Sequence, residues 1–156
     1  MWRLTASNFG TIVKLTSRRN MPKFLSMLLS PGAIYAKSVS HGRHYEPIAK
    51  EKLGAVIGKD VEECGLFVSS EYPFFAATPD GLVGEDTLVE VKCPYSGRNE
   101  IITMDQKFPF LDKIDNELTV KKSHNYYDQI QGQLFIANRK CCLFSIYTFS
   151  SFVTLK

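Results

Sequence analysis

The amino-acid sequence predicts an α/β domain with a mixed central sheet flanked by helices. Apolar residues recur at helical spacing in the first third of the chain and again near residue 130, which predicts helices. Between these segments lie short runs rich in β-branched and aromatic residues, which predict strands. The resulting order is three helices, three strands, a helix and a strand, and it is typical of helices packed on a mixed sheet.

The three early helices are predicted over residues 6–15, from Pro22 to Pro31–Gly32, and from Ser40 to about Ile57. Thr5 or Ser7 can cap the first helix, and Pro22 suits the first turn of the second. Pro47 predicts a kink or a fresh start within the third. The apolar positions expected to face inward are Phe24, Leu25, Leu28 and Leu29 in the second helix and Tyr45, Ile48, Ala49, Leu53 and Val56 in the third.

The rest of the chain alternates strands with one long helix. The expected strands are Val61–Val68, Phe74–Thr78, Thr87–Cys93 and Cys141–Phe149, and the long helix is His124–Asn138. Residues 95–122 are predicted to form a short helix near 98–106 followed by a mobile loop, and residues 151–156 to begin another strand.

Composition places the chain among globular domains. Its 156 residues are enough for one domain with a real core. The net charge of +3 permits a nucleic-acid partner but does not indicate one by itself. The sequence contains no run of about 18 apolar residues and does not begin like a signal peptide, so we expect no membrane span and an intracellular setting, nuclear or cytoplasmic.

The four cysteines show no Cys-x-x-Cys spacing. Cys141 and Cys142 are adjacent, and neighbours on a strand point to opposite faces, which is unfavourable for a shared iron–sulfur cluster. We interpret the four as reduced, mostly buried thiols, with the cluster as the alternative.

The strongest candidate site combines Asp80 with Glu90 and Lys92. Alternate residues of a strand face the same side, so Glu90 and Lys92 are expected roughly 6–7 Å apart on one face, with Val89 and Val91 facing a core on the other. A turn at Pro79-Asp80-Gly81-Leu82, followed by Gly84-Glu85-Asp86, can fold the chain back so that Asp80 meets Glu90. Taken alone, Asp80 is typical of a turn, and Glu90-x-Lys92 is typical of a strand face that is exposed to solvent. Their combination favours a metal site.

The chemistry of this set suits Mg²⁺, with Mn²⁺ as a substitute. Mg²⁺ prefers hard oxygen ligands, which Asp80, Glu90 and the backbone carbonyl of Val91 can supply. Lys92 can orient or deprotonate an attacking water and neutralise charge on a phosphate, and a lysine beside a cation is expected to titrate low.

Two helices offer further candidates. Glu46 on the third helix is a candidate metal ligand, although its register also permits ordinary surface charge. On the long helix, Tyr126, Gln129 and Gln133 recur at i, i+3 and i+7 and form one polar stripe. This stripe indicates either amides that face the site or a solvated face.

Several motifs occur together and in one order: Leu4-Thr5-Ala6-Ser7-Asn8-Phe9-Gly10, Gly42-Arg43-His44-Tyr45-Glu46, Ala77-Thr78-Pro79-Asp80-Gly81-Leu82, Glu90-Val91-Lys92-Cys93-Pro94 and Tyr126-Tyr127-Asp128-Gln129-Ile130-Gln131. On these motifs the chain resembles the lambda-exonuclease-like viral recombinase (YqaJ) domain of the PD-(D/E)xK nuclease superfamily. The resemblance implies a restriction-endonuclease-like core, with residues 1–156 as a single domain that is shortened at both ends relative to the family pattern.

The resemblance also implies roles for individual residues. Asp80, Glu90, the Val91 carbonyl and Glu46 would bind the metal, and Lys92 would act on the water. Gln129, Tyr126 and Gln131 would support the site. The residues implied for the DNA 5′ phosphate are Ser7, Thr78 and Arg3.

The function implied by the resemblance is 5′→3′ exonuclease activity on linear duplex DNA in recombination or DNA processing. The implied partners are DNA, a single-strand annealing protein and further copies of the chain, as in the trimeric phage enzymes. A structure-specific endonuclease and a non-catalytic DNA-binding module on the same core are the alternatives.

Overall fold

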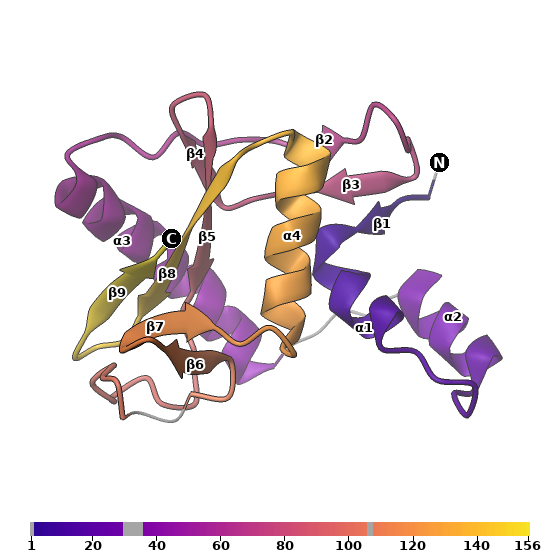
Figure 1. Cartoon of the computed structure of the whole chain (residues 1–156), viewed down its shortest axis with the longest axis horizontal. Helices are drawn as coiled ribbons and strands as arrows, with labels where there is room; N and C mark the ends of the chain where they lie inside the picture. Colours follow the sequence, from indigo (N-terminus) through magenta and orange to yellow (C-terminus); the bar gives the residue numbers. More distant parts are fainter. Residues whose placement is uncertain (1, 30–35, 106–107) are drawn as a thin grey trace.

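A computed structural model describes residues 2–29, 36–105 and 108–156 (Figure 1). Its helices are α1 (Phe9–Val13), which follows a 3₁₀ turn at Ala6–Asn8, α2 (Met21–Leu29), α3 (Lys37–Ile57) and α4 (Asn125–Ala137). None of the helices in the described ranges is long and apolar enough to cross a membrane.

The strands form three sheets. The main sheet has the order β4 (Gly81–Val83), β5 (Thr87–Lys92), β8 (Cys141–Tyr147) and β9 (Phe152–Leu155). The pair β5–β8 is parallel and the other two pairs are antiparallel, so the sheet is mixed as the sequence predicts. A second sheet has the order β1 (Leu4–Thr5), β3 (Phe75–Ala77) and β2 (Phe67–Val68), and β6 (Leu111–Ile114) pairs with β7 (Glu117–Val120) as a hairpin.

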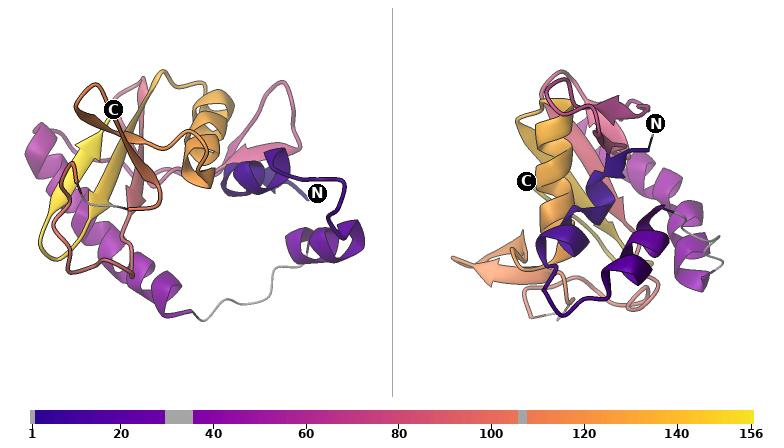
Figure 2. Two further views of the ribbon diagram at one scale, coloured as in Figure 1. Left: turned by 60° about the horizontal axis from the view of Figure 1, so that its bottom comes forward. Right: turned by 90° about the vertical axis from the view of Figure 1, so that its right-hand side faces the viewer.

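The main sheet separates two hydrophobic clusters. On one face, Ala49 and Leu53 of α3 pack against Val89 and Val91 of β5. On the other face, Ile130 of α4 joins a larger cluster that includes buried residues of β5 and β8, namely Leu88, Cys142, Phe144 and Ile146. The two views in Figure 2 show α3 and α4 on opposite sides of the sheet. Strand β5 therefore lies between two helices, and its alternate residues face different ones.

The early helices differ from the prediction in detail. The first is a 3₁₀ turn followed by the five-residue α1, and Thr5 at its start makes no side-chain capping bond. In α2, Phe24 is buried, but Leu25 and Leu29 are exposed, so the inward prediction is wrong for these two. The predicted stop at Pro31–Gly32 lies outside the described residues.

Helix α3 runs without interruption through Pro47, so the fresh helix start at that residue is wrong. Ala49 and Leu53 are completely buried as predicted, whereas Ile48 and Val56 are exposed. The helix begins at Lys37, before the predicted Ser40. This long, continuous helix brings Glu46 near Asp80 and the end of β5.

The segment before α4 was predicted least well. Described residues near 98–105 form turns and bends, not a helix, and the hairpin β6–β7 was not predicted. Its turn is formed by Asp115 and Asn116, both with positive φ (48° and 66°), a conformation that Asn and Asp tolerate in tight hairpins. The predicted strand Val61–Val68 is reduced to β2 and a bridge between Glu62 and Leu82. The predicted strand at 151–156 is confirmed as β9.

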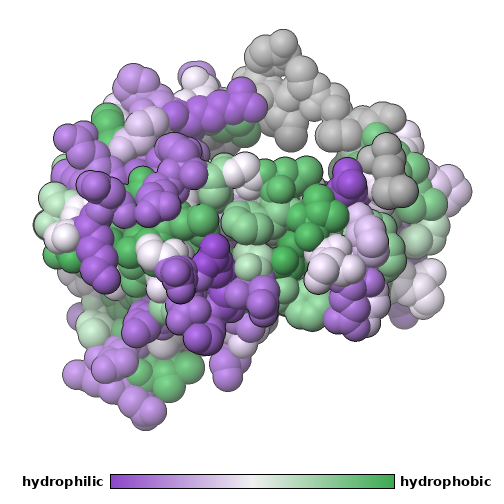
Figure 3. All heavy atoms as spheres, turned by 90° about the horizontal axis from the view of Figure 1, so that it is seen from above, coloured by the Kyte–Doolittle hydropathy of each residue, from purple (hydrophilic) through white to green (hydrophobic). Residues whose placement is uncertain are grey.

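Exposed aromatic side chains gather beside the end of α4. Tyr72, Phe74 and Phe135 are 39%, 51% and 53% exposed, and the Tyr72 ring lies 6.0 Å from that of Phe74 and 6.1 Å from that of Phe135. Seen from above, hydrophobic residues reach the surface between more hydrophilic ones (Figure 3). The second sheet and the end of α4 thus carry an apolar surface separate from the core of the main sheet.

Candidate functional site

Glu90 lies at the centre of the site, in the middle of β5. Its side chain is nearly inaccessible, at 2% exposure of the residue, because it points toward α4. Oε1 accepts hydrogen bonds from Lys92 Nζ and from Gln129 Nε2 at 2.7 Å, and Oε2 accepts one from Gln133 Nε2 at 2.7 Å. A buried carboxylate is tolerated when its charge is paired and its oxygens accept hydrogen bonds, and Glu90 meets both conditions.

Lys92 occupies the same face of β5 two residues later. Its Nζ contacts Glu90, lies 3.5 Å from Gln129 Oε1 and sits 4.6 Å from the centre of the Tyr126 ring. Burial lowers the pKa of Lys92, but the Glu90 carboxylate, with smaller contributions from Tyr126 and Asp80, raises it, and the net shift of the pKa is upward. The low pKa predicted for Lys92 concerns the site with a cation and a phosphate bound and stays a prediction; without them, the contact with Glu90 favours the charged form.

Asp80 lies just before β4 and interacts with the neighbouring edge of β5. Its backbone N–H donates to the Val89 carbonyl at 3.0 Å, and its Oδ2 accepts from the Val91 N–H at 2.6 Å. Burial and the nearby Glu90 charge raise the pKa of Asp80 to about 7, against the opposing effect of the Val91 N–H. The turn thus places two carboxylates of like charge close together, as the spacing predicted.

A polar cavity of 260 Å³ opens beside these residues. Glu46 of α3, Asp80, Val91, Lys92 and Tyr126 all line it. The N–H and the carbonyl of one strand residue point to the same edge, and the Val91 N–H points toward Asp80, so the Val91 carbonyl faces this edge as well. Residues from α3, β5, α4 and the turn before β4 therefore converge on one cavity.

The donors around this cavity fit a hard divalent cation. Asp80, Glu46 and the Val91 carbonyl can supply oxygen ligands, whereas Glu90 is buried, does not line the cavity and has both carboxylate oxygens hydrogen-bonded. The charges of Glu90 and Glu46 both raise the pKa of Asp80, and a cation would relieve this repulsion. Within the described residues, no three His, Cys, Asp or Glu side chains form a group that could hold a metal by themselves. A cation here would depend on the Val91 carbonyl and on water for further ligands, as Mg²⁺ commonly does.

Gln131 does not join the other predicted residues. It is exposed and points to a different cavity on α4, because residues 129 and 131 lie on different sides of a helix. Gln133 takes its place: it is 1% exposed and donates to Glu90. The i, i+3, i+7 stripe contained Gln133, and this periodicity was the signal that could have placed it in the site.

Lys50 is a second residue that the sequence did not single out. Its Nζ donates to the Asp80 carbonyl at 3.1 Å and lies 3.4 Å from Glu46 Oε1 and 2.6 Å from Glu63 Oε1. Lys50 follows Glu46 by one helical turn, which was a usable signal. It links α3 to the turn that holds Asp80.

The residues predicted for a DNA 5′ phosphate lie at both ends of the second sheet, with Arg3 before β1 and with Ser7 and Thr78 beyond the other ends of β1 and β3. Strands β1 and β3 pair in parallel with Thr5 opposite Ala76, so Ser7 and Thr78 follow the same ends of the two strands. Both side chains are exposed, and the Ser7 hydroxyl lies 3.0 Å from that of Thr5. Arg3 is half-buried and donates from Nε to the Pro73 carbonyl at 3.3 Å. Thr78 precedes Asp80 by two residues, which brings the Thr78 end of the sheet next to the acidic cavity.

Of the four cysteines, only Cys93 lines the acidic cavity. All four are free thiols, with Cys142 buried and the other three half-buried. Burial raises the pKa of Cys93, which also lines the cavity, to about 12. Its thiol is therefore protonated near neutral pH and a poor metal ligand.

The fold is similar to that of a solved nuclease structure. The alkaline exonuclease LHK-Exo from Laribacter hongkongensis superposes with a TM-score of 0.72 at 24% identity, over 98% of this chain and 75% of that one. Its complex with dAMP gives a TM-score of 0.71 at 26% identity. The fold is thus a restriction-endonuclease-like core. The chain belongs to the YqaJ-like viral recombinase domain family, whose model matches residues 2–140.

Two viral proteins are similar in sequence. The alkaline nuclease of Orgyia pseudotsugata multicapsid polyhedrosis virus is 27% identical over 121 residues, which cover 64% of this chain and 28% of that protein. The uncharacterized protein R354 of Acanthamoeba polyphaga mimivirus is 30% identical over 113 residues, which cover 69% of this chain and 20% of that protein. The chain therefore corresponds to less than a third of either relative.

The raised pKa of Asp80 predicts a pH-dependent stability in the absence of metal. The carboxyl has a pKa of about 7 when folded and 3.8 in its unperturbed state, so its protonation stabilises the fold below pH 3.8 and this contribution is lost as the pH rises through about 7. Asp80→Asn stays neutral. With EDTA present, its unfolding temperature should exceed that of the parent by more at pH 8 than at pH 5, as measured by thermal unfolding. An equal difference at both pH values would contradict the raised pKa.

Gln133→Leu should destabilise the protein, because Glu90 Oε2 loses its hydrogen-bond donor inside the core. We expect a loss of about 1–3 kcal/mol in the free energy of unfolding. Gln131→Leu, an exposed position on the same helix, is the matched control and should change stability by about 0.5 kcal/mol or less. Urea unfolding of both variants measures the difference, and equal effects would show that the Gln133–Glu90 contact contributes nothing.

Proposed function

We propose that this chain is a metal-dependent deoxyribonuclease that hydrolyses phosphodiester bonds, acting as a 5′→3′ exonuclease on linear duplex DNA in recombination or DNA processing. One observation carries the proposal: Asp80, Lys92 and Glu46 line one polar cavity, and Lys92 is bonded to the buried Glu90. The names of the similar proteins, a nuclease and an exonuclease, point the same way, as does the complex of LHK-Exo with dAMP. A deoxynucleoside monophosphate is the product that hydrolysis releases from a DNA end.

The cofactor in this proposal is Mg²⁺, with Mn²⁺ as a substitute. Asp80, Glu90, Glu46 and the Val91 carbonyl would hold it. When bound, such a cation polarises the phosphate and lowers the pKa of a ligated water. Asp80 and Glu90 are buried carboxylates that repel each other, and a bound cation would reduce this repulsion.

Lys92 acts in this proposal as a fixed positive charge. Glu90, Gln129 and the ring of Tyr126 hold its Nζ in place, and the Glu90 contact favours the charged ammonium form. An ammonium can donate to the attacking water and to a phosphate oxygen, which orients the first and neutralises charge that develops on the second. Removal of a proton from the water by Lys92 would first require Glu90 to be neutralised, so the orienting role is the one that the geometry favours.

Preference for a DNA 5′ end would come from the second sheet, which contains β1, β3 and β2. The side chains of Ser7 and Thr78 are exposed, with Thr78 two residues before Asp80, and Arg3 at the other end of the sheet keeps guanidinium N–H donors beyond the one bonded to Pro73. Such donors are suited to a terminal phosphate. A single-strand annealing protein, a homo-oligomer and an intracellular setting complete the proposal, on the strength of the family alone.

Digestion of three DNA substrates tests this function. Linear duplex with 5′ phosphates, linear duplex with 5′ hydroxyls and closed circular duplex are incubated with and without Mg²⁺, and released nucleotides and nicked circles are measured. We expect Mg²⁺-dependent nucleotide release, fastest from the 5′-phosphorylated substrate, and intact circles. Lys92→Ala should lose on the order of 10²–10³ in rate, whereas Lys23→Ala, an exposed lysine on α2, should match the parent.

The other outcomes distinguish the alternatives. Nicked circles would identify an endonuclease on the same core. Salt-dependent DNA binding with no cleavage in Mg²⁺ or Mn²⁺ would identify a non-catalytic module. Cleavage by Lys92→Ala at the parent rate would refute the role given to Lys92.

A further inference from the structure

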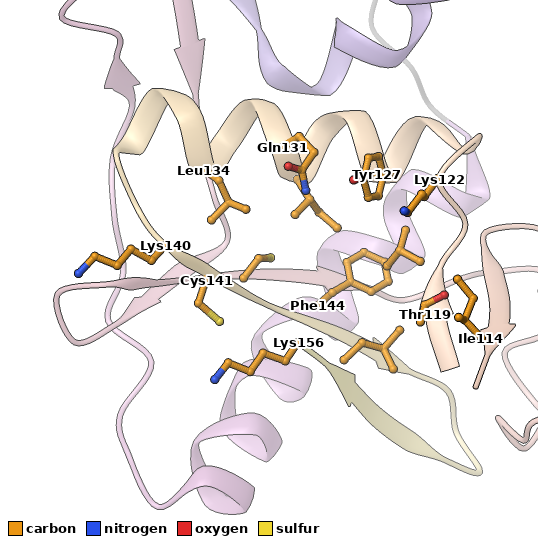
Figure 4. A pocket seen from close by; sticks show the side chains of 14 residues that line it. Ile114, Thr119, Lys122, Tyr127, Gln131, Leu134, Lys140, Cys141, Phe144 and Lys156 are labelled. Atoms are coloured by element: carbon orange, nitrogen blue, oxygen red, sulfur yellow. The ribbon is translucent and has the colours of Figure 1, made fainter. Parts of the chain in front are cut away.

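A second cavity lies on the far side of α4, away from the acidic site. It has a volume of 390 Å³ and is bounded by α4, by β8 and β9, and by the hairpin strand β7. In the close view, its side chains come from all of these elements (Figure 4). None of the residues that line it also lines the acidic cavity. We call it the lysine groove, for the three lysines described below.

The lysine groove is elongated. Tyr127, Gln131 and Leu134 line it from successive turns of α4, a separation of seven residues from first to last. At 1.5 Å per residue, this corresponds to about 10 Å along the helix axis. The floor consists of apolar side chains, among them Ile130, Phe144 and Leu155. A channel of this length and character matches a chain segment with several apolar side chains on one side.

All the charged groups that line the groove are positive. Lys122 lies toward one end, and Lys140 and Lys156 lie toward the other, where Figure 4 shows them on either side of Cys141. No Asp or Glu is among the lining residues. Lys140 pairs with Asp86 at 2.9 Å, but the two side chains are 79% and 59% exposed, so solvent screens this pair.

We propose that the lysine groove binds an acidic, amphipathic segment of a partner protein. Apolar side chains of the segment would fill the floor, and its carboxylates would meet Lys122, Lys140 and Lys156 at the rim. Docking here leaves the acidic cavity open, because the two cavities share no residue. The proposal does not depend on the nuclease activity.

Two other occupants fit less well. A single DNA strand needs accessible aromatic faces for base stacking, but of the two aromatic residues that line the groove Phe144 is 2% exposed and only Tyr127 is partly accessible. A second copy of the chain joined groove to groove would bring the lysines of both copies together, since a twofold interface pairs a surface with itself. An acidic segment is the occupant that the charge and the floor favour together.

Selection from a random 16-residue peptide library displayed on phage tests the proposal. The immobilised parent protein should enrich peptides that combine Asp or Glu with large apolar residues. Fluorescein-labelled copies of these peptides should bind the parent, as measured by fluorescence anisotropy. The variant Lys122→Glu/Lys156→Glu should bind them at least about tenfold more weakly, and thermal unfolding verifies that it is folded.

The matched control carries the same charge change far from the groove. Lys23→Glu/Lys59→Glu alters exposed lysines on α2 and after α3 and should bind like the parent. The proposal is overturned if no peptide is enriched above background, if enriched peptides lack acidic residues, or if both double variants lose affinity equally. It is also overturned if labelled oligo(dT), and no peptide, depends on Lys122 and Lys156.

Discussion

The buried carboxylate of Glu90 is the interaction on which the rest of the site depends. An ionised group removed from water costs several kcal/mol unless it is paired and hydrogen-bonded. Lys92 supplies the pair, and Gln129 and Gln133 supply amide donors from α4. These contacts connect β5 to one side of α4 and thereby fix the rotation of the helix. With this rotation, Ile130 and Leu134 face away from Glu90, into the main core and the lysine groove.

The same arrangement keeps two carboxylates that repel each other, Asp80 and Glu90, close together beside the cavity. Asp80 is held beside Glu90 by the Val91 N–H, although burial and the Glu90 charge both oppose its ionisation. Natural proteins tolerate such local conflicts mainly where function requires them. A site that is destabilised without a cation gains stability when one binds, because ligand binding to the folded state shifts the folding equilibrium. The folding cost of the site and its proposed affinity for Mg²⁺ are thus two consequences of one geometry.

The sequence predicted those parts of the site that follow from short-range periodicity. The period of two along β5 placed Glu90 and Lys92 on one face and Val91 on the other, and the Pro79–Asp80–Gly81 turn placed Asp80 beside them. The helical period selected Gln129 and Gln133 together, but the Tyr-x-x-Gln-x-Gln motif drew Gln131 into the list of supporting residues. Its side chain lies in the other cavity.

The features of the site and fold that the sequence could not predict depend on contacts between distant segments. The raised pKa of Lys92 follows from its contact with Glu90 inside a buried site, and burial is not visible in a pattern. Proximity of Lys50 to Asp80 requires α3 to pack on the face of the main sheet beside the segment that precedes β4. The hairpin β6–β7 was missed because its strands are polar, although Asp115–Asn116 was a usable turn signal.

The most direct test of the central claim is the unfolding temperature as a function of free Mg²⁺ at pH 8, for the parent and for Asp80→Asn. If the clustered carboxylates form a cation site, Mg²⁺ should raise the unfolding temperature of the parent in a saturable manner and leave that of Asp80→Asn nearly unchanged. An equal response of the two proteins, or no response of the parent, would contradict the claim that Asp80 and Glu90 are held together to bind a cation.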